Sequence, residues 1–400
     1  MTPAARISAA IEILDAVLTG APAERQLTNW ARANRYAGSG DRARVRDLVF
    51  DVLRCRRSCA WAGGAETGRG LMLGLLRLRG EDLDGYFTGE RFAPDPLTED
   101  ERSEPSLDQA PDPVQFDVPD WLFPLMQAAH GDRTPDILRE LQSRAPVFLR
   151  VNTRKGTPAQ AIAELENADV TAIPHPLAKT ALLVTENARR VGNSPAYLGG
   201  LVELQDVASQ AIVLDLPLQP GMQVLDYCAG GGGKALAIAA ACEDLVITAH
   251  DTAPQRMRDI PARAERAGVN IAIQPDKSEL SGKLFDLVFC DVPCSGSGAW
   301  RRAPEGKWNL TPKRLAELVE IQSGILDEAG QLVKAGGYLA YATCSLLSVE
   351  NATQIDRFLA RSSNFREIFR RSLTPLDGGD GFFIAVLQKS DSQSGVAEQD

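Results

Sequence analysis

From residue 220 onward, short apolar runs alternate with stretches of helical pattern, and this alternation constrains the fold more than any other feature of the chain. Strands alternating with helices are typical of a doubly wound, largely parallel sheet. We therefore predict an α/β fold whose ligands bind beyond the carboxyl ends of the strands. The expected strands are VLDYC (224–228), LVITAH (245–250), VNIAI (269–273), FDLVFCD (285–291), GGYLAYATC (336–344) and FFIAVLQK (382–389).

The chain before this sheet has two other patterns. Apolar residues recur at helical spacing in ARISAAIEILDAVL and RARVRDLVFDVLRCR, which predicts a helical first segment. A mixed region follows, with strands expected at VFLRVN and ALLVT and helices near 134–143 and after Thr157-Pro158. We expect an all-α domain at 1–92, an acidic Pro-rich linker at 93–119, a small α+β region at 120–205, the sheet domain at 206–390 and a polar tail at 391–400.

The net charge of −10 is unevenly distributed. Residues 1–60 hold ten Arg against six Asp and Glu, whereas residues 81–120 hold thirteen Asp and Glu against two Arg. A basic surface that meets nucleic acid therefore suits the first segment, although a solvated helix face explains its arginines equally well. The seven cysteines lack disulfide-scaffold spacing, and no apolar run approaches the ~18 residues of a membrane span. With no secretory signal evident, we expect a cytoplasmic protein that does not enter membranes.

A glycine run joins the first expected strand to its helix in DYCAGGGGKA. Glycine lets the backbone approach a ligand closely at this place. A dinucleotide would require G-x-G-x-x-G, a spacing that the run lacks, and the acidic Asp226 is better suited to the cationic methionine end of S-adenosylmethionine. The candidate cofactor residues here are Asp226, Cys228, Ala229, Gly230, Gly231, Gly232, Gly233 and Lys234.

Three further acidic residues each follow a strand end. Asp251 is placed to accept the ribose hydroxyls, Asp276 to meet the adenine edge, and Asp291 to reach both cofactor and substrate. Taken singly, each is explained equally well as a turn or helix cap. The ordered series past successive strands favours a cofactor site.

Two thiols also follow strand ends, Cys294 in DVPCSGSG and Cys344 in YATCS. A disulfide does not suit a reducing compartment, and the three histidines show no metal-ligand spacing, so no metal is expected. Nucleophilic catalysis remains. Methylation of cytosine at C5 requires a thiolate that adds to C6, with an acid such as Asp291 at N3. The residues alone leave either thiol as the nucleophile.

Together these motifs resemble the Sun/RsmB-type RNA cytosine-5 methyltransferases, and LRVNTRKG, VELQDVASQ and DGFFIAVLQK are similar to that family's flanking signatures. The resemblance implies a Rossmann-like class I methyltransferase sheet, S-adenosylmethionine as cofactor and a NusB-like RNA-binding domain at the start. It also implies that Cys344 attacks, that Cys294 assists release, and that Lys234 touches the base or its phosphate. The family usually has Ala-Pro where Gly230 and Gly231 stand, and Thr at Ala235, so we expect a less preorganised cofactor loop.

We therefore expect the chain to methylate ribosomal RNA and to act as a monomer. The alternatives are the same chemistry on tRNA, a non-catalytic RNA-binding assembly factor and, more remotely, a dehydrogenase. Cytosine within a duplex is out of reach, so the target must be single-stranded or flipped out. Candidate RNA contacts are Arg150, Asn152, Arg154, Lys155, Trp300, Arg301, Arg302, Lys307 and Trp308.

Overall fold

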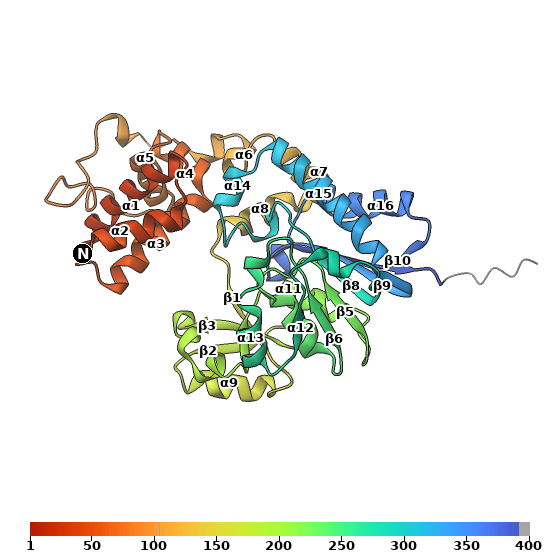
Figure 1. Ribbon diagram of the computed structural model, residues 1–400. Coiled ribbons are helices and arrows are strands. Elements are labelled where there is room, and N and C mark those ends of the chain that lie inside the picture. The colour runs from red at the N-terminus through yellow and green to blue at the C-terminus, as the bar shows by residue number, and fades with distance from the viewer. Residues whose placement is uncertain (104, 392–400) are drawn as a thin grey trace, which may run out of the picture. The chain divides into compact units, whose positions relative to one another are not determined.

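The computed structural model describes residues 1–103 and 105–391 and divides into two compact units (Figure 1). The helical unit comprises Met1–Arg144 and Trp300–Leu310, and the sheet unit comprises Ala145–Ala299 and Thr311–Asp400. Beyond Asp391, the expected polar tail lies outside the described residues. The finer boundaries at 92, 119, 205 and 390 stay predictions.

The helical unit is built from amphipathic helices around one apolar core. The first begins at Pro3 because the Thr2 side chain accepts a hydrogen bond from the Ala5 amide, which caps the helix. Leu14, Val49 and Leu71, from three helices, are fully buried in the core. The helices are α1 (Pro3–Leu18), α2 (Ala23–Ala33), α3 (Ser39–Arg54), α4 (Arg56–Gly63), α5 (Gly68–Leu78), α6 (Asp112–Gln115), α7 (Phe123–His130), α8 (Thr134–Gln142), α14 (Glu305–Asn309), and the 3-10 turns η1 (Asp100–Arg102), η2 (Leu107–Gln109) and η3 (Gly131–Arg133).

The sheet unit opens with a small antiparallel sheet in the order β2-β3-β1-β4. Its helix α9 begins with a capping box between Thr157 and Gln160, which matches the expected helix start. The sequence predicted β1, β3 and α9, but it did not predict the short strands β2 and β4. The elements are β1 (Val147–Val151), α9 (Pro158–Glu166), β2 (Thr171–Pro174), β3 (Ala181–Glu186), η4 (Ala188–Asn193), α10 (Pro195–Leu198) and β4 (Val202–Leu204).

The main sheet has seven strands in the order β10-β11-β9-β8-β5-β6-β7. The five from β7 to β9 are parallel, and β11 and β10 are antiparallel, which confirms the predicted doubly wound α/β class. The elements are α11 (Val207–Leu214), β5 (Gln223–Asp226), α12 (Gly233–Ala241), β6 (Val246–Ala249), η5 (Pro254–Met257), α13 (Ile260–Ala267), β7 (Ile271–Ile273), η6 (Lys277–Leu280), β8 (Phe285–Asp291), η7 (Ser297–Ala299), α15 (Pro312–Gln331), β9 (Val333–Thr343), η8 (Ser348–Glu350), α16 (Ala352–Arg361), β10 (Phe365–Leu373), η9 (Pro375–Asp377) and β11 (Phe382–Lys389).

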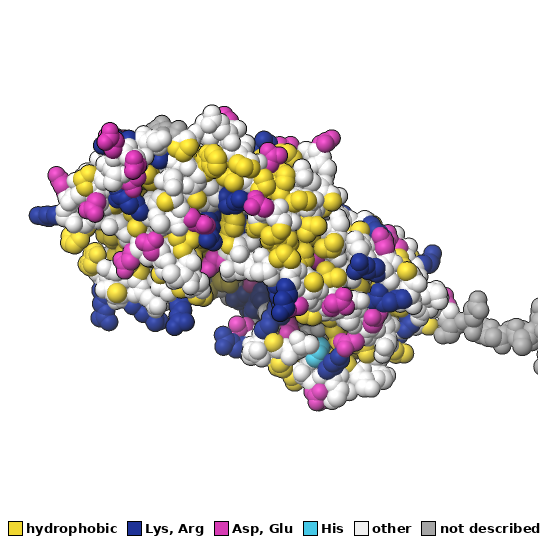
Figure 2. All heavy atoms as spheres, turned by 90° about the horizontal axis from the view of Figure 1, so that it is seen from above, with side chains coloured by type: hydrophobic (Ala, Val, Ile, Leu, Met, Phe, Trp, Pro, Cys, Tyr) yellow, Lys and Arg dark blue, Asp and Glu magenta, His cyan; other side chains and the backbone are white. Residues whose placement is uncertain are grey.

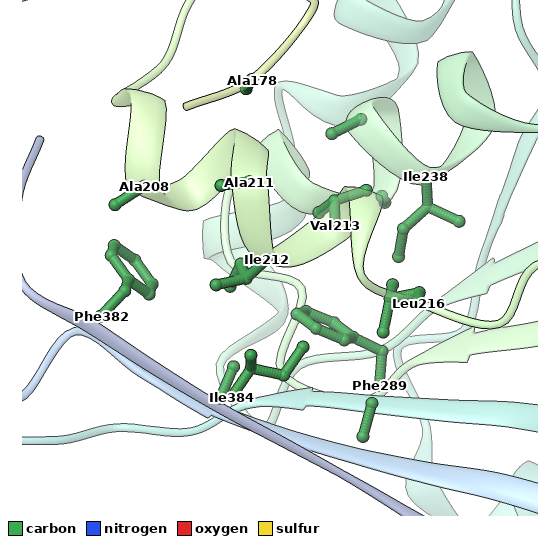
Figure 3. Packing of buried hydrophobic residues seen from close by; sticks show 14 of the residues in the cluster. Ala178, Ala208, Ala211, Ile212, Val213, Leu216, Ile238, Phe289, Phe382 and Ile384 are labelled. Atoms are coloured by element: carbon green, nitrogen blue, oxygen red, sulfur yellow. The ribbon is translucent and has the colours of Figure 1, made fainter. Parts of the chain in front are cut away.

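Helices cover both faces of this sheet, and β8 shows how the sequence directs them. Alternate side chains of a strand point to opposite faces. Phe289 accordingly belongs to the core cluster formed with α11 and α12, where it lies near Ile212 and Ile384 (Figure 3). The preceding residue, Val288, belongs to the core cluster on the other face of the sheet, which is formed with α15 and α16 and includes Leu326. Burial on both faces holds the strand ends rigidly in place.

The surface drawn in Figure 2 carries Lys and Arg side chains as well as Asp and Glu side chains, so the net negative charge does not make this face uniformly acidic. Among the described residues, none of the helices combines the length and the apolar character that crossing a membrane requires.

Candidate active site

A cavity of about 730 Å³ lies at the carboxyl ends of the strands of the main sheet. It brings together most of the residues predicted from the sequence. Gly232 and Asp276 are not among its lining residues. The predicted residues that line it are Asp226, Cys228, Ala229, Gly230, Gly231, Gly233, Lys234, Asp251, Asp291, Cys294 and Cys344.

The glycine run forms the turn between β5 and α12. Gly230 and Gly232 have φ angles of +50° and +77°, in the left-handed region that side chains disfavour. The Gly230 amide donates to Asp251 Oδ2 at 2.9 Å. Gly230 and Gly231 stand where the family usually has Ala-Pro, and Gly230 adopts the left-handed conformation at low energetic cost.

Asp226 ends β5 with a carboxyl group that is 1% exposed. Neither of its oxygens has a partner of normal hydrogen-bond geometry among the described residues, although the amides of Cys228 and Ala235 approach closely enough to favour its charged form. Burial, followed by the negative charge of Asp291, raises the pKa of Asp226 to about 7. A buried acceptor without a donor beside a cavity fits a cationic group such as an ammonium.

Asp251 and Asp276 differ in their surroundings. Asp251 is buried, lines the cavity, and accepts hydrogen bonds from the amides of Gly230 and Ala253 and from Arg256, each at 2.9 Å. Asp276 is exposed and caps η6 by accepting from the Ser278 amide at 2.8 Å, a hydrogen bond that lowers its pKa. The contact of Asp276 with adenine stays a prediction.

An ion pair lies beside the thiols. Lys234 Nζ lies 2.5 Å from Asp291 Oδ2 and 5.1 Å from the centre of the Phe382 ring. Burial lowers the pKa of Lys234, but the charge of Asp291 and the hydrogen bond to it outweigh burial, so the pKa is raised overall. The site thus holds a partly buried ammonium next to the carboxylate that was predicted to meet the base.

The two predicted thiols lie side by side, with 3.4 Å between the Sγ atoms of Cys294 and Cys344. They follow the neighbouring parallel strands β8 and β9, and both are free cysteines. The hydrogen bond with Cys344, together with burial, raises the pKa of the Cys294 thiol well above its ordinary value. Cys294 is therefore held mainly as the neutral thiol.

Close backbone packing fixes the loop that carries Cys294. The Gly298 amide donates to the Cys344 carbonyl at 2.9 Å, and the Gly381 amide donates to the Gly298 carbonyl at 2.9 Å. A Cβ at Gly298 would lie 2.1 Å from the Gly381 carbonyl oxygen. Position 298 therefore requires glycine for packing.

Several predicted RNA contacts are wrong because the side chains are buried. Within the helical unit, Trp300 and Arg301 are each 1% exposed, and Lys307 Nζ donates to the Arg54 carbonyl at 3.0 Å. Burial lowers the pKa of Lys307 to about 8. In the sheet unit, buried Arg150 donates to the side-chain oxygen of Gln205 at 2.6 Å.

Asn152, in the same strand region, is likewise buried and donates to the carbonyls of Gly200 and Ala267 at 3.2 and 2.8 Å. The exposed residues Arg154 and Lys155 stay predicted RNA contacts.

Sequence reasoning missed several residues of the cavity. Gln205, Arg256, Lys277 and Glu328 line it, and Glu328 accepts from the Tyr227 hydroxyl at 2.7 Å. Arg256 follows Asp251 closely in the sequence, so its place in the cavity could have been predicted. Glu328 comes from α15, far along the chain, and has no local signal. Over the described ranges, no group of three His, Cys, Asp or Glu is arranged to hold a metal ion.

A doubly wound sheet with an antiparallel edge, a glycine turn after its first strand and acids past the following strands defines a methyltransferase of the Rossmann-like class. Comparison with known proteins narrows the class. The family model described as 16S rRNA methyltransferase RsmB/F matches residues 212–388, and the ferredoxin-like domain model of the same proteins matches residues 118–190.

The chain is 32% identical to the ribosomal RNA small subunit methyltransferase B of Vibrio cholerae, over 70% of this chain and 67% of that protein. It is 29% identical to the protein of that name in Erwinia tasmaniensis, over 89% and 92% of the two chains. The crystal structure of PH0851 shares the fold, with a TM-score of 0.76, 22% identity and coverage of 97% and 99%. The chain belongs to the RsmB/F family of RNA methyltransferases, which confirms the resemblance seen in the sequence.

Proposed function

We propose that this chain methylates C5 of a cytosine in ribosomal RNA, with S-adenosylmethionine as methyl donor and Cys344 as nucleophile. One observation carries the proposal: two free thiols lie 3.4 Å apart in the cavity that also holds the Lys234–Asp291 ion pair. The names of the family model and of the relatives, all ribosomal RNA methyltransferases, support the substrate class.

The residues present fit S-adenosylmethionine. The orphaned carboxyl of Asp226 is suited to the ammonium of the methionine end, and Asp251 lies past the next strand, where ribose hydroxyls are accepted in this fold. The turn that includes Cys228, Ala229 and Gly230 would lie against the cofactor. When bound, the cofactor supplies a methyl group on a sulfonium, which is an electrophilic carbon.

The reacting base requires a thiol because C5 of cytosine is a poor nucleophile. Sγ of Cys344 forms a bond to C6 while Asp291 holds the N3 edge, and C5 then carries the electron pair that takes the methyl group. A water or hydroxide from solvent takes the C5 proton, the electrons of the C5–H bond re-form the C5–C6 double bond, and the Cys344 thiolate leaves C6. Cys294, the neighbouring neutral thiol, assists this release, and Lys234 holds Asp291 in place and neutralises charge beside the base.

A denaturing gel tests the assignment of roles. Wild type, Cys294→Ala and Cys344→Ala are each incubated with unmodified 16S rRNA transcript and S-adenosylmethionine. We expect a covalent RNA adduct to accumulate with Cys294→Ala only, because attack remains and release is impaired. An adduct with Cys344→Ala only would make Cys294 the nucleophile. Absence of methyl transfer by wild type on every RNA pool would refute the enzymatic proposal and favour a non-catalytic RNA-binding role.

A further inference from the structure

A buried carboxylate, that of Glu350, lies close to the two loops that carry the thiols. Glu350 ends η8, which follows β9, and its side chain is 0% exposed. It is not among the residues that line the cavity. A carboxylate in such a place is costly unless several donors surround it. Its partners therefore indicate what it does.

Both oxygens of Glu350 accept hydrogen bonds from the thiol-bearing loops. Oε1 accepts from the Ser295 amide at 2.8 Å and from Gln322 Nε2 at 3.0 Å. Oε2 accepts from the hydroxyls of Ser295 and Ser345, each at 2.5 Å. Ser295 and Ser345 each follow directly after one of the two cysteines. One carboxylate thus holds both loops.

The partners of Glu350 are themselves fixed. Gln322 Nε2 also donates to the Pro293 carbonyl at 3.0 Å, and its side-chain oxygen accepts from Gln354 at 3.2 Å. These contacts connect α15 and α16 to the loop between β8 and η7. The hydroxyls of Ser295 and Ser345 also lie 3.2 Å apart. The network is buried and, at Glu350, fully supplied with donors.

We infer that Glu350 is a positioning residue that fixes the separation of the Cys294 and Cys344 sulfur atoms by acting through Ser295 and Ser345. The consequence for catalysis rests on the proposed function, in which both sulfurs act on the same base. The separation of the two sulfur atoms is a property of the protein alone and is measured without RNA. Misplacement of a reacting group by about 1 Å lowers rates by as much as ~10²-fold.

Glu350→Gln is the informative variant. An amide has one acceptor oxygen, and its NH₂ group would face donors, so the four hydrogen bonds cannot all be kept. The exposed Glu320→Gln on α15 is the matched control. Three quantities are measured in each: affinity for phenylarsine oxide, which binds two adjacent thiols; kcat for methyl transfer; and the Kd for S-adenosylhomocysteine. Cys344→Ala gives the arsenical background from other cysteines.

We expect Glu350→Gln to lose ~10-fold or more in arsenical affinity and up to ~10²-fold in kcat, with a Kd for S-adenosylhomocysteine within about two-fold of wild type. Wild-type arsenical affinity in the variant would overturn the inference. Loss of all three properties together would also overturn it, because the carboxylate would then support the unit as a whole.

If Glu350→Gln does not fold, Ser345→Ala is measured in the same way, since it removes one donor and keeps the carboxylate. An unchanged arsenical affinity in Ser345→Ala overturns the inference. The proposed function fails separately: a wild-type chain that transfers no methyl group, while Glu350→Gln still loses arsenical affinity, refutes the enzymatic proposal and supports the positioning of the thiols.

Discussion

The raised pKa of Asp226 gives a quantitative prediction about stability. Its folded pKa of about 7 lies above its ordinary value of 3.8, mainly because of burial. The protonated group therefore contributes stability that is fully present below pH ~4 and is lost as the pH rises through 7. The difference of ~3 pH units at ~1.36 kcal/mol each amounts to ~4 kcal/mol of lost stability. About 1.5 kcal/mol of this is already lost at pH 5 and nearly all of it at pH 8.

Asp226→Asn removes this titration, so the unfolding free energy of the variant should gain ~2.5 kcal/mol on wild type between pH 5 and pH 8. Urea unfolding at several pH values measures the difference, and the constant cost of the substitution cancels in the comparison. Asp276→Asn is the control, since its pKa is lowered and it does not titrate in this range. A difference between Asp226→Asn and wild type that is flat with pH would refute the reasoning from burial.

Two further predictions concern packing and charge. Gly298→Ala would place a Cβ 2.1 Å from the Gly381 carbonyl oxygen, so we expect this variant to lose methyl transfer and ~2 kcal/mol or more of unfolding free energy. The control is Gly40→Ala, which lies in a helix with open space around its Cβ. In urea unfolding, Gly40→Ala should raise stability by ~0.5–1 kcal/mol. Lys307 has a pKa lowered to about 8 by burial, so its cost to the folded state is present below pH 8 and is removed as the pH rises toward its ordinary 10.5. Between pH 7 and pH 10, the unfolding free energy of wild type should therefore rise by about 2–3 kcal/mol relative to that of Lys307→Met, as measured by urea unfolding. If the two unfolding free energies changed in parallel with pH, the burial of the ammonium would be contradicted.

The main sheet was predictable because its strands are strongly apolar and end at residues with distinctive chemistry. The expected strands at 285–291 and 382–389 coincide with β8 and β11. Strand β10 escaped prediction because its sequence FREIFRRSL alternates half-buried and exposed positions at the edge of the sheet and carries several charges. Strand β4 has only three residues, too few for a periodic signal.

The candidate site was predictable where a motif follows a strand, and not where a partner comes from elsewhere. Cys294 and Cys344 were each predicted to follow a strand end, and because parallel strands of one sheet end at the same edge, the 3.4 Å between their sulfur atoms agrees with that prediction. The carboxylate of Glu350 gave no such signal, since a Glu after a strand is ordinary in sequence. Its importance appears only when four donors are seen around it.

The sequence by itself determined the kind of protein: the alternation of strands and helices, the glycine turn, the acids and the thiols are properties of neighbouring residues, and local spacing encodes them. The tertiary structure alone decided which charges are paired and which cations are buried. Lys234 meets Asp291, and Arg301 and Lys307 lie within the helical unit although a cationic run after a catalytic loop suggested RNA. The reason is physical, because the cost of a charge depends on burial and on partners within a few ångströms, and packing between segments distant in the chain sets both.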